Sequence, residues 1–411
     1  MEAREQKGLE IAAKSKLQRS GDRWFVPAQT GHRGTYYTVK PDAANPQCSC
    51  PDFEARQLRC KHLYAVEYVI QREFTFNEET QTETITETVT VKQTYKQEWS
   101  AYNEAQTNEK ERFLALLADL CKGIEAPEQT IGRPRLPLAD MVFASAFKTY
   151  STVSGRRFMT DLRDAHSKGY LSKAPHYNSI SRYLENSGLT PILKALIEQS
   201  SLPLQAIESD FAVDSSGFST SRFVQWMHAK YTEPHLIQRR QFIKCHLMVG
   251  VKTNIVTAVE MTDGFEADSP KFEPLVETTA KNFTMQEVSA DKAYLSAKNL
   301  QVVVKNHAQP YIPFKTNSTH DARCQGRPMI WKQMYHLYHY NSERFMESYH
   351  KRSNVETTFH MIKSKFGIAL RSKTKTAQIN EALCKVLCHN ICCLIQSIFE
   401  LGIEPTFWAE S

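Results

Sequence analysis

The chain has 411 residues, a formal net charge of +6 and ten cysteines. That length allows two or three domains, and the mildly basic charge fits a nucleic-acid partner without requiring one. The N-terminus is charged and lacks the apolar segment of a signal peptide, and no stretch approaches the roughly eighteen apolar residues of a membrane span. We therefore expect a cytoplasmic protein whose cysteines are reduced or metal-bound rather than paired in disulfides.

Residues 1–73 predict a small module of a β-hairpin followed by a helix. The runs RWFVPAQ and GTYYTVKP are short, rich in aromatic and β-branched residues, and separated by a turn that contains two glycines. The later run LYAVEYVI can form a helix.

Four metal-ligating side chains lie between this hairpin and this helix, within fifteen residues: Cys48, Cys50, Cys60 and His62. Residues two apart in extended backbone point the same way, so Cys48 and Cys50 can converge. Cys60 and His62 can join them from the start of the helix. Three thiolates and one imidazole complete a tetrahedral site with no open position, which predicts a structural Zn²⁺ ion. The pattern, including the CPDF and CKH sequences and the preceding hairpin, resembles the SWIM zinc finger.

Two regions of different character follow the module. Residues 74–96 are dominated by Thr and Glu without helical periodicity, which predicts a linker with at most a weak strand in TITETVTV. Residues 97–203 predict helices, with an apolar repeat at Phe113, Leu116, Leu117 and Leu120. The many Lys and Arg residues of this second region suit DNA-end binding or dimer formation, and a solvated charged face is the alternative.

Residues 204–402 predict an α/β domain. SDFAVDSSGF, KCHLMVGV, IVTAVEMTD and EVSAD are strand-like, whereas helices are predicted from near Ser269, in LSAKNLQVVVKN and in the C-terminal stretches. Strands interleaved with helices are typical of an α/β layer fold. We expect the first strand to end at Asp214, before a Ser-Ser-Gly turn, and the fourth to end at Asp291.

Three carboxylates in this domain predict a metal site. Asp214 and Asp291 stand where ligand chemistry sits in an α/β sheet, and Glu356 on a late helix supplies a third acid. Three carboxylates suit two Mg²⁺ ions about 3.5–4 Å apart, which can activate an attacking oxygen and stabilise the leaving one in phosphodiester displacement. Either aspartate alone is also typical of a turn or a helix cap.

The stretch YHKRSNVETTFHMIK, residues 349–363, predicts one helix around Glu356. At about 100° per residue, four polar side chains fall within roughly 60° of one another, beside an apolar stripe that faces the core. These four are Tyr349, Arg352, Glu356 and Lys363. The alternative is a solvated helix edge that carries an ordinary Arg–Glu pair one turn apart.

The chain resembles the DDE transposases of bacterial insertion sequences, in particular the group with a Tyr-Arg-Glu-Lys signature. The resemblance rests on the spacing Tyr-x2-Arg-x3-Glu-x6-Lys and on the sequences DSSG and ADKAY, and its residues are Asp214, Asp291, Tyr349, Arg352, Glu356 and Lys363. It covers roughly residues 207–401. It implies a ribonuclease H-like mixed sheet flanked by helices.

What this resemblance implies is a DNA transposase that binds element ends and performs two-metal strand cleavage and strand transfer. The three acids would hold two Mg²⁺ ions, for which Mn²⁺ can substitute. Tyr349, Arg352 and Lys363 would face the phosphates of the transposon end. Double-stranded DNA is then the partner, a homodimer that pairs two ends is the simple assembly, and the bacterial cytosol or nucleoid is the place of action.

Three other functions fit parts of the same pattern. A domesticated, catalytically silent transposase would bind DNA as a repressor. A different nuclease on the same fold would cut RNA–DNA hybrids or junctions, and a zinc-finger adaptor would use its C-terminal half only as a scaffold. Among weaker signals, GRPR at residues 132–135 is either a minor-groove element or a basic linker. Trp331 either stacks on an unpaired base or is an ordinary core or surface residue, and Cys384, Cys388 and Cys392 are expected to be buried thiols.

Overall fold

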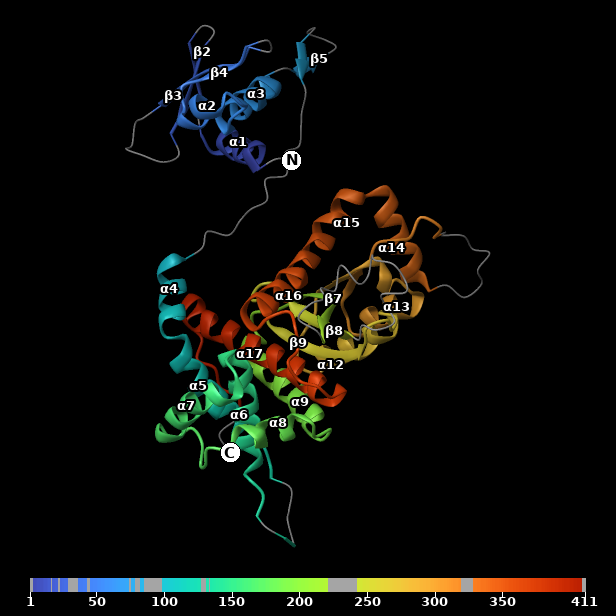
Figure 1. Cartoon of the computed structure of the whole chain (residues 1–411). Coiled ribbons are helices and arrows are strands. Elements are labelled where there is room, and N and C mark those ends of the chain that lie inside the picture. The colour runs from blue at the N-terminus through green and yellow to red at the C-terminus, as the bar shows by residue number, and fades with distance from the viewer. Residues whose placement is uncertain are drawn as a thin grey trace, which may run out of the picture. The chain divides into compact units, whose positions relative to one another are not determined.

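The structure is a computed structural model that places the chain in two compact units, residues 1–96 and residues 97–411 (Figure 1). Each unit is described by itself. The residues described are 3–15, 17–20, 23–28, 36–42, 45–73, 75–77, 82–84, 98–126, 131–132, 134–220, 242–318 and 328–408.

The first unit is a small antiparallel sheet with helices. Its strands are β1 (Gln18–Ser20), β2 (Arg23–Pro27), β3 (Tyr36–Lys40) and β4 (Gln47–Cys48), paired in chain order. The predicted hairpin is confirmed, because β2 and β3 pair antiparallel with Trp24 opposite Val39. Its helices are α1 (Ala3–Lys14), α2 (Pro51–Arg56) and α3 (Lys61–Glu73), and α1 packs on α3.

The segment predicted as a linker contains one short hairpin, in which β5 (Thr75–Asn77) pairs with β6 (Thr82–Thr84). The suggested strand TITETVTV runs from residue 84 to residue 91, and beyond Thr84 it lies outside the described residues.

The second unit begins with helices, as the apolar periodicity predicts. They are α4 (Trp99–Thr107), α5 (Glu109–Cys121), α6 (Leu138–Ser151), α7 (Gly155–Ser167), α8 (Tyr177–Leu184) and α9 (Leu189–Ser201). Phe113, Leu117 and Leu120 of α5 are fully buried, and the breaks before α8 and α9 fall in the sequences GYLSKAPHYNS and NSGLTP. Residues 97–411 form one compact unit, so these helices pack with the sheet that follows.

The sheet of the second unit is mixed, with the strand order β11-β10-β7-β8-β9. Its strands are β7 (Asp210–Ser219), β8 (Phe242–Gly250), β9 (Val256–Asp263), β10 (Glu287–Ala290) and β11 (Gln309–Tyr311). The first three form an antiparallel meander, whereas β10 lies parallel to both β7 and β11. Because every residue of β8 is buried, both faces of this sheet are covered.

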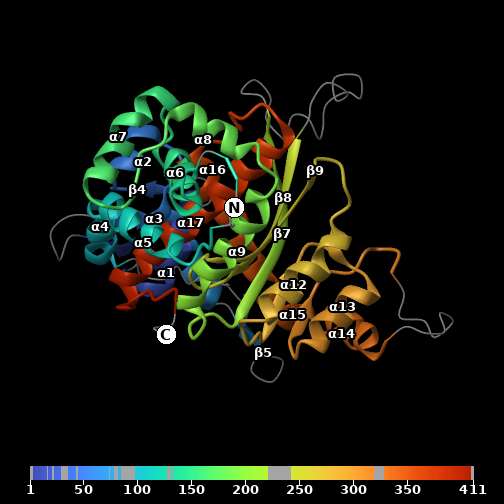
Figure 2. The same cartoon turned by 90° about the horizontal axis from the view of Figure 1, so that it is seen from below.

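Helices cover both faces of the sheet (Figure 2). One face packs against α9 and against α16 (Ser353–Phe366) and α17 (Lys375–Leu401). The other packs against α12 (Phe272–Ala280), α13 (Ala297–Lys305), α14 (Met329–Tyr340) and α15 (Ser342–Tyr349). Phe211 and Val213 of β7 belong to this second core, whereas Ala212 and Phe218 belong to the first. The two-residue period of the strand therefore sends Asp214 toward α16 and Ser215 toward the opposite face.

Two local predictions were wrong. β7 does not end at Asp214 but continues through the Ser-Ser-Gly sequence to Ser219, because the antiparallel partner β8 keeps pairing as far as Phe242. The stretch 349–363 is not one helix. α15 ends at Tyr349, a 3₁₀ turn spans His350–Arg352, and α16 follows from Ser353.

Among the described helices, α17 is long and apolar enough to cross a membrane, which the sequence analysis did not expect. However, 78% of its most apolar segment is buried inside the protein, as in the core helix of a globular unit. It packs against α4, α5, α6, α8 and α9. Cys384 and Cys388 on this helix are fully buried free thiols, as expected, whereas Cys392, for which the same was expected, is only partly buried. Trp331 lies in the core against Phe314 rather than on the surface.

Candidate active site and zinc site

The register of the sheet brings the two aspartates side by side. Val213 of β7 pairs with Ala290 of β10 in the parallel ladder, so Asp214 and Asp291 are the next residues on neighbouring strands. Adjacent strands lie about 5 Å apart. β10 ends at Ala290, one residue before the predicted end at Asp291. Asp291 caps the short 3₁₀ helix Lys292–Tyr294 by accepting the Lys292 amide at 2.6 Å.

Glu356 approaches Asp214 from α16 through a shared arginine. Arg352 donates to Asp214 Oδ2 at 2.6 Å and to Glu356 Oε1 at 2.5 Å. Arg352 sits at the end of the 3₁₀ turn, so the change in helix geometry places its guanidinium between the strand and the next helix. The Glu356 side chain is 57% exposed, whereas those of Asp214 and Arg352 are 19% exposed. The third acid is therefore at the open side of the group.

The three acids and Arg352 form a site in which carboxylates outnumber cations. Burial raises the pKa of Asp214 to about 6, and the neighbouring Asp291 and Glu356 carboxylates act in the same direction. The Ser215 amide, which donates to Asp214 at 2.7 Å, and the Arg352 guanidinium oppose the rise in pKa. Burial would lower the pKa of Arg352, but the two carboxylates outweigh it and raise that pKa. A group of this kind favours a cation among its oxygens.

The other two signature residues lie at the margins of the same group. Tyr349 stacks its ring against the Arg352 guanidinium at 5.8 Å, and burial raises the pKa of its hydroxyl. Lys363 lies farther along α16 and donates to Ser216 Oγ at 2.6 Å, two residues after Asp214 on the same face of β7. Burial lowers the pKa of Lys363, which also lies over the ring of Phe218.

A cavity of about 710 Å³ opens next to Asp291. Its lining combines aromatic and cationic residues, several of them from the segment that follows β11, and includes Lys292, Phe314, Lys315, Tyr338 and Tyr349. Asp291, directly after β10, therefore borders a cavity rather than packed core.

Lys351 is a structural cation that the sequence analysis missed. It donates to Asp210 at 2.8 Å and to Glu287 at 2.6 Å, the paired first residues of β7 and β10. These two ion pairs hold the 3₁₀ turn against β7 and β10. Only the register of the sheet makes these two acids neighbours, so no spacing in the sequence indicates the contact.

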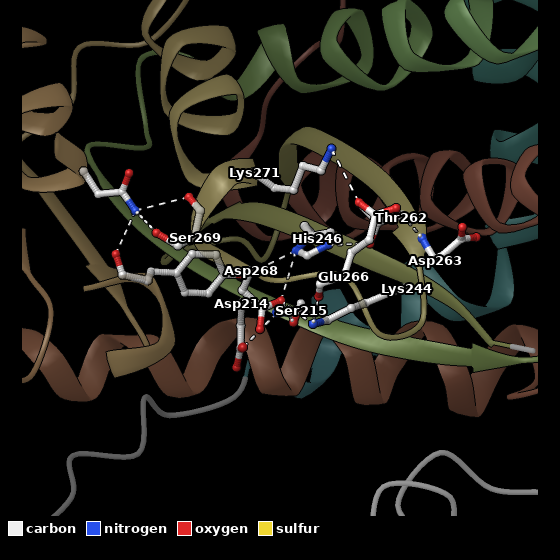
Figure 3. Close-up of polar contacts among 12 residues, drawn as sticks. Asp214, Ser215, Lys244, His246, Thr262, Asp263, Glu266, Asp268, Ser269 and Lys271 are labelled. Atoms are coloured by element: carbon white, nitrogen blue, oxygen red, sulfur yellow. Dashed lines mark hydrogen bonds and ion pairs between the residues drawn. The ribbon is translucent and has the colours of Figure 1, made fainter. Parts of the chain in front are cut away.

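A second group of charged residues lies behind Asp214, on the opposite face of the sheet (Figure 3). Asp268 accepts from Ser215 Oγ at 2.8 Å and pairs with Lys244 Nζ at 2.5 Å. His246 lies 3.4 Å from the same carboxylate, and burial lowers its pKa to about 4. The polar side chains of Lys244 and His246 in the otherwise apolar run FIKCHLMVG are the signal that sequence reasoning could have used.

This network reaches the second aspartate as well. The Tyr294 hydroxyl lies 3.4 Å from His246 Nδ1, and the Tyr294 amide donates to the Asp291 carbonyl at 2.9 Å. Asn299 Nδ2 donates a hydrogen bond to the Tyr294 carbonyl at 2.7 Å. Polar contacts therefore connect the strand of Asp214 to the turn of Asp291 through buried side chains.

The first unit holds a compact set of four possible metal ligands. One ligand atom from each of Cys48, Cys50, Cys60 and His62 lies within 4.8 Å of the others, and all four residues are buried. His62 Nδ1 is 3.9 Å from both the Cys48 and the Cys60 sulfur. A tetrahedral zinc ion at ordinary bond lengths sets nitrogen and sulfur about 3.6 Å apart, so the set fits the ion.

The protonation chemistry of the set also suits a metal ion. The contact with the Cys48 thiol lowers the pKa of Cys60 to about 4, while that contact and burial raise the pKa of Cys48. His62 Nε2 is buried without a hydrogen-bond partner among the described residues. The ring thus has sulfur atoms as its close polar neighbours, as expected of a nitrogen ligand in a Cys₃His site.

Comparisons with known families agree with this geometry. Residues 206–391 match the transposase DDE domain family, and residues 37–71 match the SWIM zinc finger family. The match to the first family contains the two aspartates, the 3₁₀ turn and α16. Searches of curated proteins and of solved structures returned no match.

The chain therefore contains a DDE transposase domain and a SWIM zinc finger. The first supports a transposase role and an activity on DNA, and it implies a divalent metal. The second, together with the buried Cys₃His set, supports a structural zinc ion in the first unit.

Proposed function

We propose that the protein is an insertion-sequence transposase that cleaves DNA strands at the ends of its element and joins them to target DNA. The observation that carries the proposal is the meeting of three acids from separate elements beside the interior strands β7 and β10 of the sheet. Neither a helix cap nor a turn requires Glu356 to share a partner with Asp214. The strand order β11-β10-β7-β8-β9 supports a ribonuclease H-like fold for the same region.

Asp214, Asp291 and Glu356 would hold two Mg²⁺ ions. When bound, such ions activate the attacking oxygen and stabilise the leaving oxygen of a phosphodiester. Asp214 is fixed by the Ser215 amide and by its strand, so it supplies the rigid part of the site. Glu356 is the more exposed acid and completes the site from the helix.

Arg352 would act in two capacities. In this structure its guanidinium pairs with both Asp214 and Glu356 and keeps the two carboxylates together. Once cations balance these carboxylates, its planar donors are available to a phosphate beside the same acids, for which bidentate Arg contacts are well suited. Tyr349 stacks on this guanidinium and would follow it to the DNA. Lys363 would add positive charge two residues along β7 from Asp214.

The remaining parts fit the same activity. The helices of residues 97–203 expose cations, among them Arg156, Arg157 and Arg182, and would bind the DNA end or a second copy of the chain. Two ends have to be joined, so a homodimer in a paired-end complex is the assembly that we propose. The boundaries 97–203 and 204–402 are proposed functional divisions within one compact unit.

Strand cleavage tests the proposal. End-labelled duplexes from both flanks of the gene are incubated with the full chain in Mg²⁺, in Mn²⁺ and in chelator. We expect nicking at a discrete position in either metal and none in chelator. Cleavage that persists in chelator, or cleavage of RNA–DNA hybrids in preference to duplex DNA, would contradict the proposal.

The alternative function is that of a catalytically silent DNA-binding protein. The observation that favours it is that Arg352 pairs with two of the three acids. The same assay separates the two functions, because the silent protein retards the flanking duplexes on a gel but nicks them in neither metal.

A further inference from the structure

A second polar cavity lies away from the three acids, where the helical region meets the C-terminal helices. Its volume is about 290 Å³. It is lined by the end of α6, the start of α7, one side of α8 and the stretch from Phe366 to Lys385. None of Asp214, Asp291 and Glu356 lines it.

The lining of this cavity is rich in cations. Lys148, Arg371, Lys373 and Lys385 line it, against the carboxylates of Glu185 and Glu381. Glu381 is already engaged, because its oxygens accept the amides of Arg371 and Ser372 at 2.8 to 3.0 Å. No salt bridge joins the four cations to an acid within the described part of the chain. The cavity therefore carries positive charge that its own carboxylates do not balance.

Two of these cations are held close together. Lys148 Nζ and Arg371 Nη1 donate to the same acceptor, the Val153 carbonyl, at 2.6 and 3.0 Å. Like charges this close repel each other, and an anion between them would offset that repulsion by attracting both. Burial lowers the pKa of Lys148 to about 8, and Arg371 lowers it further whereas Glu381 opposes the shift. Lys385 is fully buried, and burial also lowers its pKa to about 8.

The cavity also offers neutral donors. Thr152, Ser154 and Ser181 contribute hydroxyl groups, and Ser154 precedes the first turn of α7, whose amides point outward. Arg156 lies at the rim, stacked on the ring of Tyr177 at 5.5 Å. Hydroxyl groups, helix amides and arginine are the donors that phosphate oxygens use in proteins.

We propose that this cavity binds a phosphate group. The group is either a backbone phosphate of DNA or a free phosphate compound. If the source is DNA, the inference rests on the proposed function, because the cavity then anchors the substrate at a distance from the acids. The segment that carries Arg371 is also bonded to the strand of Asp214, since Ser219 exchanges hydrogen bonds with Ile368 and Leu370 at 3.3 and 2.8 Å.

Calorimetry of the full chain with inorganic sulfate tests the inference, because sulfate has the shape and charge of phosphate but does not titrate near neutral pH. We expect saturable binding at pH 8 that is weakened at least tenfold by Arg371→Gln and by Lys148→Met. The matched controls are Arg163→Gln and Lys298→Met, which remove the same charges from exposed positions outside the cavity. Binding should be accompanied by proton uptake, because an anion raises the pKa of Lys148, and the uptake should fall in Lys148→Met.

Failure to bind sulfate, or binding that the cavity variants and the controls affect equally, would overturn the inference. A duplex oligonucleotide that displaces sulfate identifies DNA as the source, and a duplex that leaves sulfate bound identifies a free phosphate compound. The Glu356→Gln variant should bind sulfate like wild type. Sulfate binding is thus measured independently of strand cleavage, so either proposal can fail without the other.

Discussion

Replacing Asp268 with Asn should destabilise the sheet by removing the counter-charge of a buried lysine. The Lys244 side chain is 10% exposed and pairs with Asp268 at 2.5 Å, and its other described acceptor is the Glu266 carbonyl at 3.1 Å. Breaking a buried pair from one side costs about 3–5 kcal/mol. Because Asp268 is 20% exposed and Lys244 keeps its carbonyl partner, we expect about 2–3 kcal/mol here.

A double-mutant cycle separates this pair from its surroundings. Lys244→Met alone should lower the free energy of unfolding by a similar amount, because the Asp268 carboxylate loses its lysine. Its remaining partners are then Ser215 and His246. The double variant Lys244→Met/Asp268→Asn should lie within about 1 kcal/mol of wild type, because no buried charge remains unpaired. The free energy of unfolding is measured by urea denaturation followed by circular dichroism, on full-length protein with zinc present.

The reasoning is refuted if the two single changes cost less than about 0.5 kcal/mol each, or if their costs simply add in the double variant. The same variants report on the acids, because Asp268 holds the side chain of Ser215, whose amide holds Asp214. We therefore expect Asp268→Asn to need more Mg²⁺ for half-maximal strand cleavage than wild type does. An unchanged Mg²⁺ requirement would show that the network stabilises the sheet without positioning Asp214.

Three further predictions follow from other parts of the chain. Cys60→Ser should abolish zinc binding, measured as bound metal per chain, and should remove the thermal transition of residues 1–96 only, whereas Cys392→Ser, a thiol outside the Cys₃His set, should retain the ion. Burial lowers the pKa of His389 from 6.5 to about 4, so this ring stays neutral in the fold, and its contribution is present above pH 6.5 and lost as the pH falls toward 4. His389→Gln should therefore flatten the loss of stability between pH 6.5 and 4 by up to about 3 kcal/mol in urea denaturation, and a variant with the wild-type pH profile would contradict the assignment. Lys351→Met should cost about 1–3 kcal/mol, because it leaves Asp210 and Glu287 facing each other across two strands, and a change below about 0.3 kcal/mol would contradict this.

The sequence predicted helices and strands well where one hydrophobic pattern continued without a break. The apolar repeat of α5, the alternation of β2 and β3 and the apolar runs of β8 and β9 are local signals, and each element lies where its signal stands. The ligand set of the first unit was also visible, because all four ligands lie within one short segment and converge locally.

The sequence did not predict features that depend on contacts between segments far apart in the chain. The Ser-Ser-Gly sequence is typical of a turn, yet β7 runs through it because β8 supplies hydrogen bonds along its whole length. The stretch around Arg352 has uninterrupted helical character, and its 3₁₀ turn coincides with the ion pairs of Lys351 and Arg352 to strands that lie far off in the sequence. The network of Asp268 likewise joins segments that only the sheet register brings together.

The central claim is that Glu356 acts with Asp214 and Asp291 in metal-dependent strand cleavage. The most direct test compares Glu356→Gln with Glu347→Gln, which removes an equal charge from an exposed position on α15, on the same labelled duplex in Mg²⁺ and Mn²⁺. We predict that Glu356→Gln abolishes nicking while it keeps wild-type DNA binding and zinc content, and that Glu347→Gln nicks like wild type. Nicking by Glu356→Gln at the rate of its control would contradict the account.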